Sequence, residues 1–181
     1  MADSEDDLLA EDAAERVKNG TAEDIWIPVD FLREDIPPPK APLPSIAVQI
    51  SRMNVVEKVK LAMLGGKEAR ILLTHDSNKV VRRYVLYNPR ITEQEIAMIA
   101  QNRLTDEEQL RTIADKKEWM RNYQVRVALV KNPKTPLPAA IGLLPTLMEH
   151  DLARMAKSRD LPDGVLNHAR RLVLERRERK Q

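Results

Sequence analysis

An internal repeat constrains the fold of this chain more than any other feature of its sequence. When the 181-residue sequence is shifted by 44 positions against itself, a set of equivalent residues falls into register: Asn78 on Asn122, Val81-Arg82 on Val125-Arg126, Leu86 on Val130, Asn88-Pro89 on Asn132-Pro133, Ile96 on Ala140 and Ile99 on Leu143. A unit of this length cannot bury an apolar face alone, so neighbouring copies must stack. The sequence therefore predicts a helical repeat domain.

Apolar residues at helical spacing run through the whole of this zone. Three segments, beginning at Ile96, Leu110 and Leu152, each place two large apolar residues and one alanine on a single helical face. Thr92 to Glu95 and Thr105 to Glu108 have the pattern of capping boxes, which mark helix starts. The sequence predicts no strand, and it predicts helices near 54–64, 67–74, 78–87, 92–101, 105–115, 118–131, 136–147, 149–157 and 162–178.

The predicted core follows from the same periodicity. Apolar residues on the inward face of each predicted helix should be buried between neighbouring helices. These core candidates are Val59, Leu61, Leu64, Leu72, Val81, Val85, Ile96, Ile99, Leu110, Ile113, Val125, Leu129, Leu143, Leu152, Met155 and Leu172.

Charge divides the chain into three zones. Residues 1–35 form an acidic tail with twelve acids against three bases, a net charge of −9, around an apolar island at 25–32. Residues 36–47 form a proline-rich linker that favours extended backbone. Residues 48–181 form the helical repeat domain, which ends in a basic C-terminal helix, and residues 36–181 together carry +11. We expect 1–47 to be an extended tail, disordered or only locally ordered.

Composition argues against an enzyme or a metal protein. The chain has no cysteine, which excludes disulfides, a thiol nucleophile and thiolate metal sites. Its three histidines lack metal-ligand spacing, and no nucleophile elbow is present. We therefore expect no cofactor and no catalysis. The acidic N-terminus lacks the features of a secretory signal, and no apolar run reaches the ~20 residues of a membrane span, so we expect a cytoplasmic protein without a membrane partner.

The repeat resembles a known class of helical repeat. The segment from Asp76 to Thr92, which includes Val81-Arg82 and Asn88-Pro89, resembles one unit of the leucine-rich-repeat variant family within the wider HEAT and armadillo group. The segment from Asn122 to Pro136 is similar. The resemblance implies an all-α, short right-handed α-solenoid of stacked helical pairs that acts as a binding platform without catalytic residues. The cysteine-bound iron–sulfur cluster of some members cannot transfer to this chain.

Bases around the repeat helices are the candidate binding residues. They could form a positive surface that attracts nucleic acid or an acidic peptide, or they could be an ordinary solvated face. The members of this predicted basic surface are Lys79, Arg83, Arg90, Arg121, Lys131 and Lys134. Tyrosines among them are predicted to pack, although they could stack on single-stranded bases. Three further residues, Asp76, Arg82 and Arg126, are predicted to brace adjacent repeats rather than to form a ligand-binding ladder.

The apolar island of the acidic tail is a candidate docking segment. Its members are Ile25, Trp26, Ile27 and Phe31, with Trp26 and Phe31 as the expected anchors. The island could dock on the basic surface of its own chain as an autoinhibitory segment, on a partner, or on a second copy to give a homodimer.

The sequence thus favours a non-catalytic protein–protein interaction module, an adaptor or scaffold whose partner is another protein or a peptide. A protein that binds RNA or DNA through the basic face is the alternative.

Overall fold

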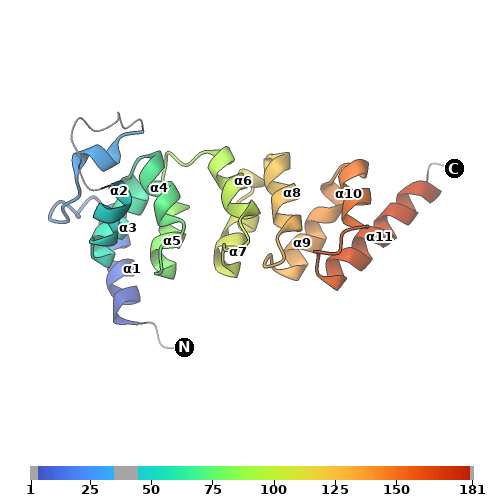
Figure 1. The fold of residues 1–181 in the computed structure, drawn as a ribbon, viewed down its shortest axis with the longest axis horizontal. Helices are drawn as coiled ribbons and strands as arrows, with labels where there is room; N and C mark the ends of the chain where they lie inside the picture. The colour runs from blue at the N-terminus through green and yellow to red at the C-terminus, as the bar shows by residue number, and fades with distance from the viewer. Residues whose placement is uncertain (1–3, 35–44, 180–181) are drawn as a thin grey trace. The chain divides into compact units, whose positions relative to one another are not determined.

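The structure, a computed structural model, describes residues 4–34 and 45–179 of the chain. The described residues form helices joined by turns and loops, and they contain no strand (Figure 1). The chain divides into two compact units, Met1–Ile91 and Thr92–Gln181. We call them unit 1 and unit 2, and each has a buried apolar cluster of its own.

Unit 1 is organised around one central helix. Its elements are α1 (Glu5–Lys18), η1 (Val29–Leu32), α2 (Ile46–Ser51), α3 (Val55–Leu64), α4 (Lys67–Leu73) and α5 (Lys79–Val85). Helix α3 packs against both α1 and α5, and α4 lies against α3 and α5. The core therefore forms around α3, with Val59, Leu61 and Ala62 completely buried.

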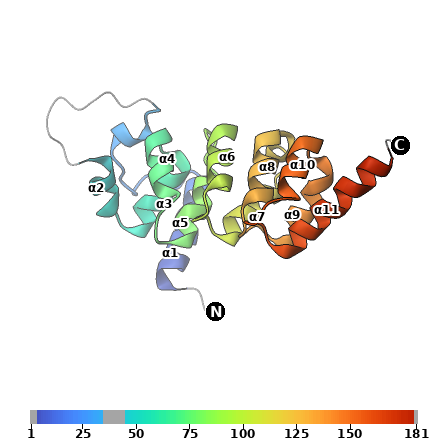
Figure 2. The ribbon, with the colours of Figure 1, turned by 45° about the vertical axis from the view of Figure 1, so that its right-hand side comes forward.

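Unit 2 consists of two rows of helices (Figures 1 and 2). Its elements are α6 (Glu93–Gln101), α7 (Glu107–Asp115), η2 (Trp119–Arg121), α8 (Tyr123–Lys131), α9 (Leu137–Leu143), η3 (Leu144–Thr146), α10 (Glu149–Met155) and α11 (Asp163–Glu178). Helices α6, α8 and α10 follow one another in one row, and α7, α9 and α11 form the other. Contacts between α6 and α8, α8 and α9, and α10 and α11 join the unit.

The helices predicted from residue 54 onward are confirmed to within two residues at their ends, with two exceptions. The predicted helix 136–147 ends at Leu143 as an α-helix, and Leu144–Thr146 continue as the short 3-10 helix η3. The predicted helix 118–131 is split, because Asn122 caps α8 by accepting hydrogen bonds from the amides of Gln124 and Val125. The capping box from Thr92 to Glu95 is present.

The second predicted capping box is wrong. Asp106, rather than Thr105, caps α7, where its carboxylate accepts a hydrogen bond from the amide of Gln109. Thr105 is buried instead, and its hydroxyl donates to the carbonyl of Ile99 at 2.7 Å. The hydroxyl therefore ties the loop after α6 back to that helix.

Most of the predicted core is confirmed. Leu64, Leu72, Leu143 and Leu172 are only partly buried, and the other twelve candidates are buried. The four exceptions lie at the margins of the apolar clusters, where they still pack against buried residues.

The expectation of a disordered or only locally ordered tail needs correction, because the tail begins with a helix. Ser4 caps α1, acids fill its first turn, and Arg16 and Lys18 occupy its last turn, an order that the helix dipole favours. Ala10, Ala13 and Ala14 are fully buried, and they form a narrow stripe that allows α1 to approach α3 closely. Residues 36–44 of the predicted linker lie outside the described residues, and α2 begins at Ile46.

A buried asparagine shows that the sequence repeat is also a structural repeat. The side-chain amide of Asn88 donates to the carbonyls of Ala62 and Gly65 at 2.9 and 3.0 Å, and its Oδ1 accepts from the amide of Arg90. Both carbonyls lie at the C-terminal end of α3, where helices leave acceptors without partners. The asparagine thus joins the loop after α5 to the end of the neighbouring helix.

The second copy makes the same contacts in unit 2. The side-chain amide of Asn132 donates to the carbonyls of Ala100 and Asn102 at 2.8 and 3.0 Å, and its Oδ1 accepts from the amide of Lys134. Asn88 and Asn132 are 2% and 4% exposed, so water does not replace these bonds. The sequence predicted only a turn at each Asn-Pro pair.

Replacing either buried asparagine with aspartate should destabilise the protein. Asn132→Asp retains the acceptor but removes the donor and leaves two carbonyls unsatisfied beside a buried charge, so we expect a loss of roughly 1–3 kcal/mol. The matched control is Asn102→Asp, because Asn102 uses only its Oδ1, which accepts from the amide of Leu104. Urea unfolding should show a lower midpoint for Asn88→Asp and Asn132→Asp than for Asn102→Asp, and equal midpoints would contradict the assignment.

Candidate functional site

Three loops of unit 2 form one edge that carries a cluster of bases. They follow α6, α8 and α10, and a side chain in each loop forms hydrogen bonds that fix it. Asn102 holds the first loop through its bond to the amide of Leu104, and Asn132 holds the second through its bonds to the end of α6. In the third, the hydroxyl of Ser158 accepts from the amide of Asp160 at 3.2 Å. Local hydrogen bonds therefore shape the edge.

One pocket on this edge is cationic. Its volume is about 240 Å³, and its lining consists of Arg103, Lys131, Arg154, Met155, Ser158, Asp160 and Leu161. Three bases thus face a single acid across a concave surface. An anionic group that enters the pocket would meet two guanidinium groups and an ammonium group, which are strong donors to carboxylate oxygens.

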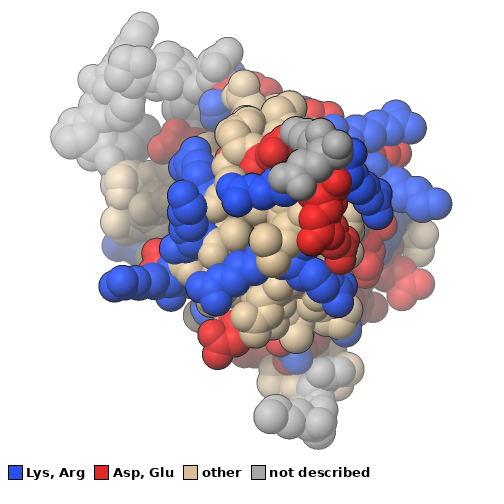
Figure 3. Space-filling model, turned by 90° about the vertical axis from the view of Figure 1, so that its right-hand side faces the viewer, with Lys and Arg blue, Asp and Glu red and all other residues tan. Residues whose placement is uncertain are grey.

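The two arginines at this pocket form long ion pairs. Arg103 lies 3.4 Å from Asp160, and Arg154 lies 3.8 Å from Asp151, with both arginine side chains about 70% exposed. Such pairs contribute little to stability and exchange readily for an external anion. Lys131 has no ion-pair partner among the described residues. The end of the molecule that carries α10 and α11 shows bands of Lys and Arg with uncharged surface between them (Figure 3).

A second pocket adjoins the first on the same loops. Its volume is about 450 Å³, and its lining consists of Glu107, Pro133, Lys134, Thr135, Pro136, Leu137, Pro162 and Gly164. A Cβ at Gly164 would lie 2.9 Å from Leu137 Cδ1, so a larger residue here would displace the Leu137 side chain. Leu161 lines the first pocket and Pro162 the second, so the two are neighbours. We call the lining residues of both pockets together the loop edge.

Sequence reasoning found only part of the loop edge. It identified Lys131 and Lys134, but it missed Arg103, Arg154 and the acid Asp160. The sequence does relate the two loops, since Asn102-x-x-Thr105 and Asn132-x-x-Thr135 share one pattern at a spacing of 30 residues, but this shift places Arg103 on Pro133 and so does not single out the arginine. The hydroxyls of both threonines are buried and donate to the carbonyl six residues earlier. Arg121, also predicted, is exposed at the end of η2 and lines neither pocket.

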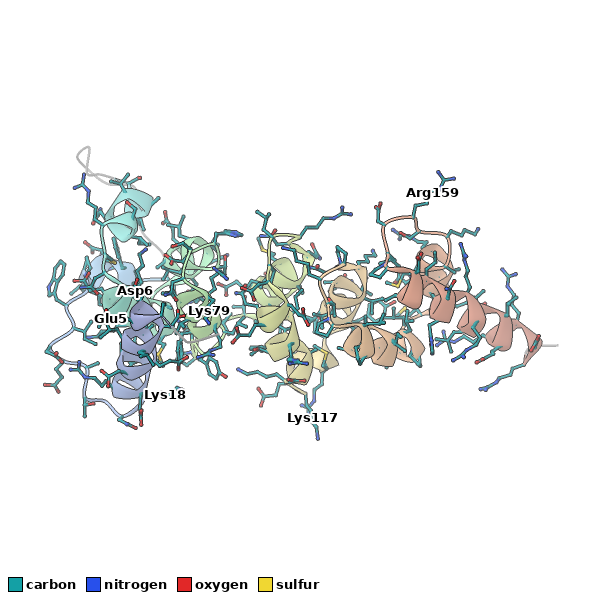
Figure 4. All side chains as sticks on the ribbon, turned by 90° about the horizontal axis from the view of Figure 1, so that it is seen from below. Glu5, Asp6, Lys18, Lys79, Lys117 and Arg159 are labelled. Carbon is teal, nitrogen blue, oxygen red and sulfur yellow. The ribbon has the colours of Figure 1, made fainter. Side chains whose placement is uncertain are left out.

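The predicted bases of unit 1 do not form an open surface, because the acidic N-terminal segment pairs with them. Asp7 lies 3.4 Å from Lys79, and Glu11 pairs with Arg83. Both acids belong to α1, whose N-terminal end, marked by Glu5 and Asp6, lies beside Lys79 (Figure 4). Helix α1, which was predicted to be part of a tail, therefore neutralises part of the predicted basic surface.

The third of these bases, Arg90, belongs to a cluster around Glu34. Arg90 donates to the carbonyls of Leu32 and Leu64, and it lies 3.6 Å from the Glu34 carboxylate. Arg70, which is 1% exposed, binds both oxygens of Glu34 at 2.9 and 3.2 Å. A buried guanidinium needs such a bidentate partner. Glu34 of the N-terminal segment thus helps to hold unit 1 together.

The tyrosines among these bases differ in burial: Tyr84 is buried, Tyr123 is partly buried, and Tyr87 is 43% exposed, so the packing prediction is confirmed for Tyr84 only. The Tyr84 hydroxyl donates to Glu11 at 2.6 Å, and the Lys18 ammonium lies 5.1 Å from the ring centroids of both Tyr84 and Tyr87. Burial, reinforced by the Glu11 carboxylate, raises the pKa of Tyr84 to about 12. Tyr123 is similar in unit 2, where its hydroxyl donates to the buried carboxylate of Asp151.

The apolar island docks within unit 1, but Trp26 takes no part. Ile25, Ile27 and Phe31 are buried, whereas Trp26 is 72% exposed. The ammonium of Lys60 donates to the carbonyls of Ala22 and Ile25, which fixes the backbone before the tryptophan. The prediction that Trp26 anchors the segment on its own chain is therefore wrong.

The predicted bracing residues hold loops to their own helices. Arg82 donates to the carbonyls of Asp76 and Ser77, and Arg126 donates to the carbonyl of Met120 at 2.8 Å. In each copy the arginine thus reaches back six residues to the segment before its helix. The Asp76 carboxylate pairs instead with Lys58 of α3 at 2.8 Å, and that pair joins neighbouring helices.

The described residues contain neither a membrane-spanning helix nor a cluster of metal ligands. No helix among them is both long and apolar enough to span a membrane. No group of three or more His, Asp or Glu residues in the same part of the chain could hold a metal ion. In comparisons with known proteins, no family model, no curated protein and no solved structure matches the chain.

The raised pKa of Tyr84 predicts a loss of stability in alkali. Tyrosine in an unfolded chain ionises near pH 10, whereas folded Tyr84 stays protonated to about pH 12. The unfolded state therefore releases this proton first, and the stability that the hydroxyl contributes falls as pH rises through that window. Urea unfolding of wild type and Tyr84→Phe should converge between those pH values, while Tyr87→Phe serves as control. A constant difference from wild type would contradict the prediction.

Proposed function

We propose that the protein is a non-catalytic protein–protein interaction module, an adaptor or scaffold that binds an acidic segment of another protein at the loop edge. In this proposal the helical pairs stack as a right-handed α-solenoid resembling the leucine-rich-repeat variant and HEAT-like repeats. The equivalent contacts of Asn88 and Asn132 support that architecture. The observation that carries the binding proposal is the cationic pocket, where Arg103, Lys131 and Arg154 face one acid.

The distribution of charge supports the choice of an acidic partner. Residues 92–181 contain 17 bases and 13 acids, a net charge of +4, whereas residues 1–91 contain 13 bases and 15 acids, a net charge of −2. The chain's own acidic N-terminal segment also pairs with the predicted bases of unit 1. Unit 2 therefore offers the positive field that would steer an acidic segment toward the pocket.

Nucleic-acid binding is the second candidate, and the exposed arginines of α11 are the observation that favours it. Arg170, Arg171 and Arg177 are exposed on that helix. Against it, Tyr84 is buried and Tyr123 is partly buried, which leaves little ring face free for stacking on bases. Phosphate contacts by several of these arginines would make binding fall steeply with salt.

Charge reversal at the pocket tests the proposal. A fluorescently labelled peptide of alternating Asp and Leu is the probe, and anisotropy measures its affinity for the full chain. We expect Arg103→Glu/Lys131→Glu to weaken binding about tenfold or more, because two contacts with carboxylates become repulsive.

The matched control reverses two bases of unit 2 that line neither pocket. Lys117→Glu/Arg121→Glu changes the net charge equally, and Lys117 points into solvent (Figure 4). The proposal requires the control to bind within about twofold of wild type. Equal weakening by both variants, or tighter binding of a single-stranded RNA of the same length, would contradict it.

A further inference from the structure

We propose that the acidic segment bound at the loop edge is residues 23–30 of a second copy of this chain. The inference rests on the proposed function, because it names the partner of the same site. It begins from the most exposed tryptophan and valine of the described residues, Trp26 and Val29, which are 72% and 71% exposed. Both lie in a short segment that also carries Glu23, Asp24 and Asp30.

The segment is anchored on unit 1 by buried isoleucines and two hydrogen bonds, while Trp26 and Val29 face solvent. Ile25 and Ile27 on either side of Trp26 are 6% and 7% exposed, so alternate residues point inward and outward. Lys60 fixes the backbone through the carbonyls of Ala22 and Ile25. A side chain presented on fixed backbone loses little conformational entropy when it binds, and exposed tryptophan is a frequent anchor of protein interfaces.

Acids flank the exposed apolar pair on both sides. Glu23 has no ion-pair partner among the described residues, Asp24 pairs with Arg16, and Asp30 lies 3.5 Å from Arg33. The side chains of Asp24 and Asp30 remain 68% and 72% exposed in these pairs. The segment therefore offers carboxylates next to large apolar side chains.

The loop edge offers two adjoining surfaces that complement the acids and the apolar side chains of the segment. Its cationic pocket suits a carboxylate, and its second pocket is walled by Pro133, Pro136, Leu137 and Pro162. At about 450 Å³ that pocket has room for an indole. Lys134 lines it and would provide a cation for the face of the ring. Acid and indole are neighbours in the segment, as the two pockets are neighbours on the edge.

Such an interface is heterologous, because the segment and the loop edge are different surfaces of each copy. Each copy then carries one donor segment and one acceptor edge, and association gives a closed ring or an open chain of copies. A heterologous interface can be distinguished from a symmetric one by mixing two variants. Two variants, one without the donor and one without the acceptor, should each fail alone and associate when mixed.

The test uses sedimentation equilibrium of the full chain over a range of concentrations. The donor variant is Trp26→Ala/Val29→Ala, and the acceptor variant is Arg103→Glu/Lys131→Glu. We expect wild type to self-associate, each variant to remain monomeric, and an equimolar mixture to form a one-to-one dimer. The matched control is Leu8→Ala/Leu9→Ala, which removes two other exposed apolar side chains of unit 1 and should associate like wild type.

Several results would overturn the inference. A wild type that stays monomeric throughout, a variant that associates alone, or a mixture that stays monomeric would each do so.

Tryptophan emission supplies a second readout. The emission of Trp26 should shift to shorter wavelength as the wild-type concentration rises, whereas buried Trp119 contributes emission that does not change. An emission spectrum independent of concentration would contradict docking between copies.

The acidic peptide probe separates this inference from the proposed function. If wild type binds the peptide through Arg103 and Lys131 but never self-associates, the proposed function stands and the second copy is the wrong partner. If neither the peptide nor a second copy binds, both proposals fail. Displacement of the peptide by the acceptor variant, which retains an intact segment 23–30, would support both.

Discussion

The side-chain amide of a buried asparagine is the interaction on which each repeat depends. In both copies one Asn donates to two carbonyls at the end of a neighbouring helix and accepts from its own loop. Without it, acceptors at a helix end would be buried and unpaired, which costs more than a typical hydrogen bond contributes. In unit 2 this residue, Asn132, also fixes the loop that carries Lys131 and Lys134. The geometry of the candidate site therefore follows from the repeat.

Charge is distributed differently in the two units. The acids of the N-terminal segment bind Lys79, Arg83 and Arg90 within unit 1, so their negative charge is used in folding. Among the described residues of unit 2, the arginines of the loop edge form long ion pairs, Arg103 with Asp160 at 3.4 Å and Arg154 with Asp151 at 3.8 Å. The charge difference that the sequence shows between residues 1–35 and the rest of the chain is therefore compensated within unit 1 by ion pairs, whereas exposed bases remain on unit 2.

The sequence predicted those features that arise from local chemistry. Helical periodicity and the cap at Thr92 located most helices, and the Asn-Pro pairs located the repeat. Helix α1 was missed because its acids suggested disorder, whereas three alanines at helical spacing were enough for close packing. Trp26 was misplaced because composition does not show which side chains of an apolar island face inward. Arg103 and Arg154 were missed because only folding brings their loops together with Lys131.

The central claim is that Asn88 and Asn132 hold equivalent loops through buried side-chain amides. The most direct measurement is hydrogen exchange of the asparagine side-chain amide protons, followed by NMR in the full chain. The account predicts strong protection for Asn88 and Asn132, which are buried and donate twice, and fast exchange for Asn102, which only accepts. Exchange of Asn132 as fast as that of Asn102 would contradict the claim.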